Sequence, residues 1–383
     1  MSRRAMRPPL CRAAVLLLAA SGLIARICPA ATAPYPHSTL VRSVTWDFAG
    51  LATLRKAHGS DLWPLTWGRD GALYAAWGDG GGFQGDSDFV GRVSLGFARI
   101  EGEPRAGAPA SYAGVNLWGD APRYAQAPAQ FGGKVGTLLS LGGVLYAHGG
   151  LWLGRAGISK WEDGRDANTS LWSTDAGHSW HAAAWSSRAD LGSFVNFGRD
   201  YAGAMDGFVY MYYARAGDAT HVYLKRAPMS RLLENPDTDH HYQYFCGTAA
   251  RGAPQWSGTE HSAVAVFFDP NHALGAEAVY DTGLHRFLLT IGHAPTADYR
   301  DASAGQVGLF EARHPWGPWH TIDYEDDWGH LGPQARGDYL GLHLPTAWIS
   351  ADGTRLWAVF SSLHEYDSFN LVHAHLVLVN NPS

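Results

Sequence analysis

Two aspartates stand on either side of a turn-forming Arg69-Asp70-Gly71 in the stretch SDLWPLTWGRDGALYAAWGDGGG, residues 60 to 82. They are Asp61 and Asp79. When two carboxyl groups lie close together, the pKa of one is raised, so one can donate a proton while the other is ionised. Glycoside hydrolysis uses this division between a proton donor and a nucleophile or base. The pair therefore predicts acid–base chemistry on a glycan.

The turn predicts how the two aspartates face each other. A three-residue hairpin loop that ends in glycine places Gly68 opposite Ala72. Counting outward, Asp61 then falls directly opposite Asp79, with Cβ atoms about 4.5–5.5 Å apart. Like charges in such a pair destabilise a sheet, which favours a functional role; the alternative is that Asp61 caps a turn and Asp79 begins a loop. A register slip of one residue would put them on opposite faces.

Other polar side chains stand at similar distances from the corresponding turns elsewhere in the chain. We predict that they converge with the aspartates and contact the substrate, although each also fits a structural role with its hydrogen bonds satisfied. One aromatic residue is predicted to be a platform for a sugar ring. The predicted substrate-binding residues are Trp63, Lys134, Arg199, Asp200, Glu277, His293 and His343.

The elements that must position these residues are β-hairpins. A turn followed by an aromatic or aliphatic run recurs five times, as in ISADGTRLWAVF from residue 349. The turn glycines are spaced about 70 residues apart, so one supersecondary unit repeats along the chain. They are Gly71, Gly143, Gly207, Gly283 and Gly353.

Each predicted hairpin is followed by another β-like run, as in QVGLFEARHPWGPW from residue 306. The chain has 46 glycines, 20 prolines and no long amphipathic helical pattern, which is typical of all-β architectures. Units of three or four strands arranged radially form a β-propeller, which leaves few exposed sheet edges. We predict an all-β, five-bladed β-propeller in which residues 38–48 supply the outer strand of the last blade. A pair of β-sandwiches is the alternative.

Residues 1–33 have the pattern of a signal peptide. Arginines precede the apolar run AAVLLLAASGLIA, and ATA at residues 31–33 offers small side chains for cleavage. The apolar run is short for a membrane span. We therefore expect a secreted or periplasmic protein without a membrane span, whose residues 34–383 form a single domain.

The charge balance narrows the choice of partner. Removal of residues 1–33 leaves 24 of the 29 basic residues against 35 acidic ones, a net charge of −11. This argues against nucleic acid or an anionic membrane as partner, because both require a basic face. We expect a monomer that binds a polysaccharide or oligosaccharide.

No cofactor and no metal are predicted. Cys246 is the single cysteine after residue 33, so no intramolecular disulfide is expected and the thiol is predicted to be a small buried group. The loop DGGGFQGDSD, residues 79–88, offers Asp79, Asp86 and Asp88 to a calcium ion but lacks a full ligand pattern.

The sequence STDAGHSW, residues 173–180, matches the Asp box of sialidases and related propellers, Ser-x-Asp-x-Gly-x-x-Trp. In that motif the aspartate and glycine shape a turn and the tryptophan packs beneath it. The match therefore indicates a fold and not a site.

Four longer runs carry a further resemblance: LWPLTWGRDGALYAAWGDGGGF, NFGRDYAGAMDGFVYMYY, YDTGLHRFLLT and LFEARHPWGPW. They resemble a family of secreted five-bladed propellers long labelled a domain of unknown function, which includes endo-acting D-arabinan hydrolases. The chain is more distantly similar to the furanosidase-like propellers of arabinanases, xylosidases and fructan hydrolases. The resemblance extends over most of the chain after residue 33. It implies a glycan-active propeller whose acidic pair corresponds to Asp61 and Asp79.

Three functional hypotheses follow. The leading one is a secreted glycoside hydrolase that acts on an arabinan-like or related polysaccharide by a retaining, paired-aspartate mechanism. The second is a polysaccharide lyase, in which His293 or His343 with Tyr280 abstracts a proton while Lys134 and Arg199 neutralise a uronate. The third is a non-catalytic glycan-binding propeller.

Overall fold

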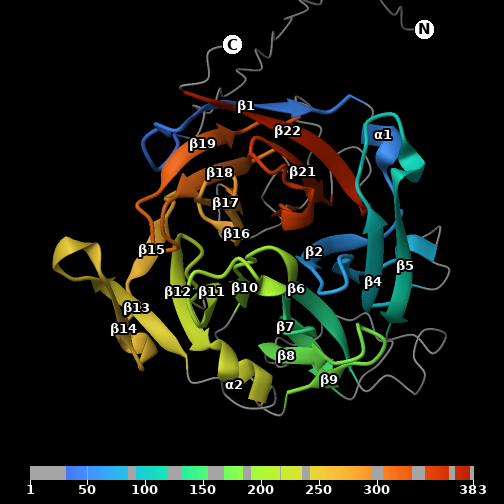
Figure 1. Ribbon diagram of the computed structural model, residues 1–383, viewed down its shortest axis with the longest axis horizontal. Coiled ribbons are helices and arrows are strands. Elements are labelled where there is room, and N and C mark those ends of the chain that lie inside the picture. The colour runs from blue at the N-terminus through green and yellow to red at the C-terminus, as the bar shows by residue number, and fades with distance from the viewer. Residues whose placement is uncertain are drawn as a thin grey trace, which may run out of the picture. The chain divides into compact units, whose positions relative to one another are not determined.

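The computed structural model describes residues 32–49, 51–84, 92–119, 131–153, 168–183, 191–215, 217–234, 242–294, 305–329, 341–361 and 367–379. Nearly all of the expected signal peptide, and the carboxylates of Asp86 and Asp88, lie outside these residues. The described chain forms five antiparallel sheets that surround a common centre (Figure 1). The prediction of an all-β, five-bladed β-propeller is confirmed.

Each sheet is one blade, and we number the blades in chain order. Blade 1 contains β2 (Asp61–Trp67), β3 (Leu73–Gly78), β4 (Leu95–Gly102) and β5 (Tyr112–Gly119). Blade 2 contains β6 (Phe131–Leu141), β7 (Val144–Leu153), β8 (Asn168–Ser173) and β9 (His181–Ala182). Blade 3 contains β10 (Leu191–Phe194), β11 (Phe208–Ala214), β12 (His221–Pro228), β13 (Gln243–Thr248), β14 (Pro254–Ser257) and β15 (Ala265–Phe268).

Blade 4 contains β16 (Leu274–Asp281), β17 (Arg286–Gly292), β18 (Val307–Ala312) and β19 (His320–Glu325). Blade 5 contains β20 (Leu342–His343), β21 (Arg355–Phe360), β22 (Asn370–Leu378) and β1 (Val41–Asp47). Short helices connect some strands, among them α1 (Leu51–Leu54) and α2 (Met229–Glu234).

The ring closes through β1. This strand pairs antiparallel with β22, from Val41 opposite Leu378 to Asp47 opposite His373. The prediction that residues 38–48 supply the outer strand of the last blade is therefore confirmed. Blade 5 thus joins an early segment of the chain to its last strand, and a closed ring leaves few sheet edges free.

The first strand of each blade lies innermost and contacts the first strands of its neighbours, as β2 contacts β6 and β20, and β10 contacts β6 and β16. Asn196, just after β10, joins several of them. Its Oδ1 accepts a hydrogen bond from Thr66 Oγ1 at 2.7 Å, and its Nδ2 donates to the Leu138 carbonyl at 3.2 Å. Its main-chain N–H donates to the Ala278 carbonyl at 3.3 Å. Buried polar groups are thereby satisfied where four blades meet.

The connections that follow the innermost strands gather at one end of the ring, which we call the turn end. Asp200, after β10, accepts a hydrogen bond from Arg69 Nε at 2.8 Å and one from the Gly143 main-chain N–H at 2.9 Å. A Cβ added to Gly283 would clash with the backbone of Gly353, so the turns of blades 4 and 5 also touch. Asp61, at the start of β2, lies at the opposite end, the strand-start end.

The five predicted turn glycines all lie between the first and second strands of a blade. In blade 3 the connection is longer than a hairpin and spans residues 195–207. In this blade, the number of residues before Gly207 therefore does not give the position of a residue along the innermost strand.

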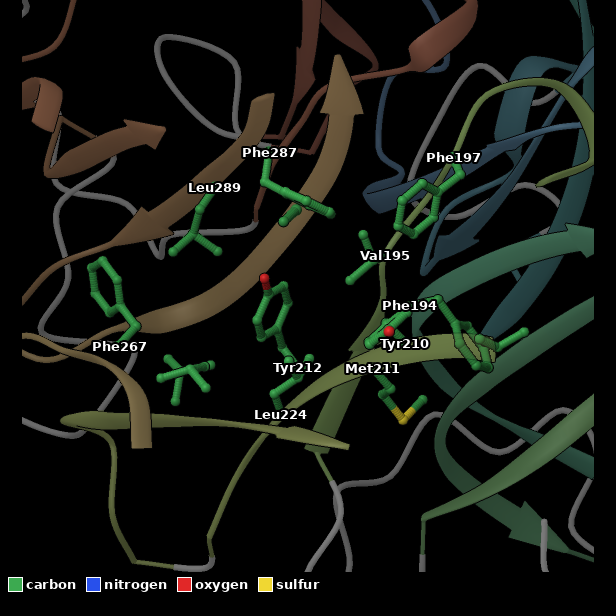
Figure 2. Close-up of a cluster of buried hydrophobic side chains, with 14 of the residues drawn as sticks. Phe194, Val195, Phe197, Tyr210, Met211, Tyr212, Leu224, Phe267, Phe287 and Leu289 are labelled. Atoms are coloured by element: carbon green, nitrogen blue, oxygen red, sulfur yellow. The ribbon is translucent and has the colours of Figure 1, made fainter. Parts of the chain in front are cut away.

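Large side chains fill the space between adjacent blades. Between blades 3 and 4, Tyr212 on β11 and Leu224 on β12 belong to one cluster with Phe287 and Leu289 on β17 (Figure 2). All four are buried. Successive strand side chains point to opposite faces, so each of these blades can pack against a neighbour on either side.

The Asp box forms the turn between β8 and β9. Asp175 Oδ1 accepts hydrogen bonds from Ser173 Oγ at 2.8 Å and from the Ser179 main-chain N–H at 2.9 Å. Trp180 stacks on Phe97 of blade 1 with ring centroids 3.8 Å apart. The motif is structural, as its sequence predicted.

Candidate active site

The predicted register of β2 with β3 is correct near the turn, where Leu65 lies opposite Ala75. On the N-terminal side of Leu65 a β-bulge shifts the pairing of β2 with β3 by one residue, so Asp61 lies opposite Gly78. The prediction that Asp61 and Asp79 form a direct cross-strand pair is therefore wrong. Asp79 is the next residue after β3, so the two aspartates are still close neighbours.

The bulge lies between Leu62 and Leu65, and Leu62 and Trp63 have left-handed φ values of 77° and 62°. Such values are costly for residues with a Cβ and persist where the surroundings hold them. Pro64 follows and has no N–H for the ladder, which explains a bulge at this place. Trp63 is fully buried: its ring centroid lies 6.1 Å from that of Trp77, and its Nε1 donates to the Ser60 carbonyl at 3.0 Å. The prediction that Trp63 is a sugar platform is wrong, because the bulge places its ring in the core.

The Asp61 carboxyl is buried, and the whole residue is 9% exposed. Its Oδ1 has no hydrogen-bond partner among the described residues. Burial raises the pKa of Asp61 to about 7; Lys134 and Arg92 oppose the rise, whereas the charges of Asp79 and Asp367 add to it. A carboxyl group in this state holds its proton near neutral pH and can act as a general acid.

Asp79 has different surroundings. Lys134 Nζ lies 2.7 Å from its Oδ1, and Arg92 Nη2 lies 2.9 Å from its Oδ2. A fifth of the Asp79 side chain is exposed, so solvent reaches it. Asp79 is thus a charge-paired carboxylate beside a buried carboxyl group whose pKa is raised to about 7.

Gly78 makes room for this arrangement. A Cβ at residue 78 would lie 2.6 Å from Asp61 Oδ1 and 2.7 Å from Lys134 Nζ. The missing side chain therefore leaves a space that the carboxyl of Asp61 and the ammonium of Lys134 share. Three groups of the predicted site, Asp61, Asp79 and Lys134, come together here.

Lys134 comes from β6 of blade 2, where a bulge at Gly136 interrupts the pairing with β7. Its Nζ also donates to the Ser94 carbonyl at 3.1 Å. Arg92, just before β4, is a site residue that sequence reasoning missed. No motif marks it, because its role depends on the ion pair with Asp79. Asp367, just before β22, was also missed, because no motif marks its approach to Asp61.

Glu277 on β16 and His343 on β20 bind each other, with Oε2 and Nδ1 2.6 Å apart. The other ring nitrogen, Nε2, lies 2.7 Å from the carbonyl oxygen of Leu62. Burial alone would lower the pKa of His343, but the Glu277 carboxylate raises it above its ordinary value. His343 thus contacts β2 beside the bulge, and Glu277 binds the opposite side of its ring. Both are buried and bound to protein partners, which gives them a role within the protein, and their direct contact with substrate stays a prediction.

Arg199 and Asp200 lie at the turn end. Arg199 Nη2 donates to the Arg69 carbonyl at 2.6 Å, and Asp200 binds the turns of blades 1 and 2 as described above. β2 spans seven residues, Asp61–Trp67, so about 20 Å separates them from Asp61. The prediction that both contact the same substrate as Asp61 is wrong, because the long blade 3 connection carries them past the innermost strand.

His293 also lies away from the pair. Its ring is fully buried, stacks on Tyr324 at 4.1 Å and bonds through Nε2 to the Glu325 carbonyl at 2.9 Å. These partners belong to β19, the outer strand of blade 4. Tyr280, the predicted lyase partner, packs against Phe197. The structure therefore does not assemble the predicted lyase residues or a substrate-facing His293.

Among the described residues, no group of three or more His, Cys, Asp or Glu side chains could hold a metal ion. In the same part of the chain, no helix is long and apolar enough to cross a membrane.

No protein-family model and no curated protein match the sequence. Solved structures resemble this chain at low sequence identity. A Bacteroides ovatus protein has a TM-score of 0.48 and 12% identity over 86% of this chain and 90% of that chain. An α-L-arabinofuranosidase from Podospora anserina has a TM-score of 0.43 and 11% identity over 90% and 99%. A GH43_1 enzyme from Xanthomonas citri has a TM-score of 0.42 and 13% identity over 85% and 92%. At these values the function must be argued from the site itself.

Proposed function

We propose that this protein is a glycoside hydrolase in which Asp61 and Asp79 cleave a glycosidic bond. The observation that carries the proposal is the contrast within the pair. Asp61 is buried with its pKa raised to about 7, whereas Asp79 is partly exposed and paired with two cations. Two carboxyl groups with unlike environments are the acid–base arrangement of glycosidases.

Asp61 is the proton donor in this proposal. Its Oδ1 is buried and has no hydrogen-bond partner among the described residues, and in this proposal the carboxyl group donates its proton to the leaving oxygen once the glycan is bound. Asp79 is the anionic member, held by Lys134 and Arg92. In the retaining mechanism Asp79 attacks the anomeric carbon, and Asp61 then activates the water that releases the product.

Retention no longer follows from the strand register, because the bulge removes the direct pair. In addition to burial, the Asp79 charge raises the pKa of Asp61, so the two groups interact, and this interaction fits either carboxyl separation. Retaining enzymes hold their carboxyl groups about 5–5.5 Å apart, against about 6.5–9.5 Å in inverting enzymes. The anomeric form of the first product distinguishes the two.

An arabinan-like polysaccharide is the proposed substrate, on the strength of the resemblance in the runs around residues 62–83 and 196–213. We also propose that the protein is exported and acts as a monomer. The lyase alternative loses support because its histidines, Tyr280 and Arg199 are not gathered at one place in the described structure.

A glycan panel tests the proposal. The purified protein is incubated with D-arabinan, L-arabinan, xylan, a fructan and a uronate-containing glycan, and the products are followed by mass spectrometry and by NMR of the anomeric proton. Hydrolysis of a neutral glycan with product masses increased by water is expected. An unsaturated product that absorbs in the ultraviolet would show a lyase. Binding without any product would show a glycan-binding propeller.

A further inference from the structure

We propose that Glu277 and His343 are positioning residues, which hold Leu62 at the edge of the β2 bulge and thereby aim the Asp61 carboxyl at the substrate. The inference rests on the proposed function and goes beyond it. It assigns a role to two buried groups that the proposed chemistry does not use.

Hydrogen bonds link Glu277 through His343 to the Leu62 carbonyl. The Leu62 carbonyl can only accept, so His343 Nε2 carries a proton and donates it at 2.7 Å. One further proton lies between His343 Nδ1 and Glu277 Oε2, which are 2.6 Å apart. A carboxylate that orients an imidazole through one nitrogen fixes the hydrogen bond that the other nitrogen makes.

The chain joins three blades at the strand-start end. Glu277 comes from the innermost strand of blade 4, His343 from that of blade 5 and Leu62 from that of blade 1. The imidazole fits closely, because a Cβ on Gly341 would lie 2.6 Å from Nε2. His343 and Leu62 are 281 residues apart in sequence, so this contact depends on the closed ring.

The bulge determines where the Asp61 carboxyl lies. Without it, the register of β2 would place Asp61 opposite Asp79, whereas with it Asp61 lies opposite Gly78 and occupies the space that Gly78 leaves free. Leu62 is the residue next to Asp61, and its left-handed φ of 77° must be maintained by contacts from outside the strand. The hydrogen bond from His343 to the Leu62 carbonyl is such a contact.

Other charged groups face Asp61 from neighbouring elements and stay in place in the test. They are Lys134 from β6, Asp79 and Arg92 from the segment between β3 and β4, and Asp367 from the segment before β22. A change in Asp61 after substitution of residues 277 and 343 therefore reports on its position and not on the removal of a neighbouring charge.

The test compares three variants. The double variant E277M/H343L removes both partners and leaves no unpaired buried charge, which favours folding. E277Q preserves the chain, because its amide can donate to Nδ1 of a neutral imidazole whose Nε2–H still donates to Leu62. T66V is the matched control, since it removes two buried hydrogen bonds of the same strand away from the bulge, the one that Thr66 donates to Asn196 and the one that it accepts from the Ser140 N–H.

The measurements are kcat, KM and the pKa of the Asp61 carboxyl followed by 13C NMR. In E277M/H343L we expect kcat to fall about 100-fold, the scale of a misplaced catalytic group, with little change in KM and an altered Asp61 pKa. E277Q and T66V should keep kcat within about threefold of the wild type, well short of that loss.

Three results would overturn the proposal: an unchanged kcat and Asp61 pKa in the double variant, a loss in E277Q as large as in the double variant, or an equal loss in T66V. If the double variant does not fold, E277M and E277Q are compared, and equal kcat values overturn the proposal. If the wild type cleaves no glycan, the proposed function fails separately. The Asp61 titration then decides the positioning role by itself, since an unchanged pKa in the variant contradicts it and an altered one supports it.

Discussion

Asp61 lies opposite Gly78, one residue before the Asp79 that the turn geometry predicted as its partner. The surroundings of the two aspartates differ. Asp61 is enclosed by the core of blade 1, and its Oδ1 has no hydrogen-bond partner among the described residues. Asp79 carries a cation on each oxygen. At the scale of single residues, the proposed chemistry rests on this difference in solvation and charge.

Removal of either carboxyl group should abolish most turnover. We expect D61N and D79N each to lower kcat at least about 100-fold, the low end of a general acid–base contribution, while the protein stays folded. Asp200 supplies the control, because its carboxylate lies at the turn end and D200A should keep the wild-type rate despite lost hydrogen bonds. Rates and circular dichroism on the same preparations check this. A near-normal rate in D61N or D79N would remove that residue from the mechanism.

The pH dependence of the rate should report the Asp61 proton. Its pKa is raised to about 7, so the activity of the acid form falls as the pH rises through about 7. Lys134 lowers this pKa, so K134M should move the alkaline limb of the kcat profile to higher pH. The measurement is kcat against pH for both proteins. A limb that moves to lower pH in K134M would contradict the assignment of Asp61 as the acid.

Stability should depend on the same proton. The folded pKa of Asp61, about 7, lies above its ordinary value of 3.8, so the folded state binds this proton more tightly than the unfolded state. The resulting stabilisation is present below the ordinary value and is lost as the pH rises through the folded pKa. Urea unfolding should therefore show that the wild type loses more free energy of unfolding than D61N between pH 4 and 7. Parallel pH profiles would contradict a buried, protonated Asp61.

At the scale of the elements, the site depends on interruptions in regular strands. Pro64 and the left-handed Leu62 and Trp63 interrupt β2. A bulge at Gly136 interrupts β6, two residues after Lys134, whose ammonium contacts Asp79. Bulges redirect side chains next to functional sites. Gly78, at the end of β3, provides the space in which the redirected groups meet.

A single methyl group at residue 78 should disturb this space. In G78A the new Cβ would lie 2.6 Å from Asp61 Oδ1 and 2.7 Å from Lys134 Nζ, so both side chains must move. We expect a fall in kcat of about 100-fold, since a displacement near 1 Å has this scale. G136A is the matched control, because a Cβ there meets nothing within 4 Å. Equal activity of the two variants would show that the space over Gly78 does not matter.

At the scale of the whole molecule, the ring depends on β1. Ser38 Oγ donates to Glu311 at 2.8 Å, and the Tyr35 ring lies 5.0 Å from that of Phe267. Together with the pairing of β1 to β22, these contacts attach residues 35–47 to blades 3, 4 and 5. The segment needed for closure therefore begins directly after the expected cleavage site.

Processing near Thr32 or Pro34 should leave this closure intact. We expect secreted material to have the mass of a chain that begins near these residues, and a chain that begins at Pro34 to melt as one cooperative unit. A chain that begins at Ala49 lacks β1 and exposes the edge of β22, so it should melt at clearly lower temperature or aggregate. Mass spectrometry and calorimetry check this. Secreted protein that still carries Met1, or an Ala49 chain as stable as the Pro34 chain, would contradict it.

The sequence by itself determined the architecture, because the relevant signals are local. A glycine turn followed by an apolar run defines a hairpin within about twelve residues, and its repetition predicted five blades and the closing strand at 38–48. The same local reasoning identified Asp61, Asp79 and Lys134, which the structure brings together.

Only the tertiary structure decided how the candidate site is arranged. Whether Trp63 faces a sugar or the core depends on one bulge, and a shift of one residue reverses the faces of a strand. Pro64 was the signal in the sequence that could have predicted this bulge. The bond between His343 and Leu62 required the closed ring, since a contact across 281 residues leaves no local pattern. Arg92 lies between β3 and β4 of blade 1, and no motif marks its ion pair with Asp79. Local periodicity thus specifies the blades, whereas the meeting of five innermost strands specifies which polar groups face each other.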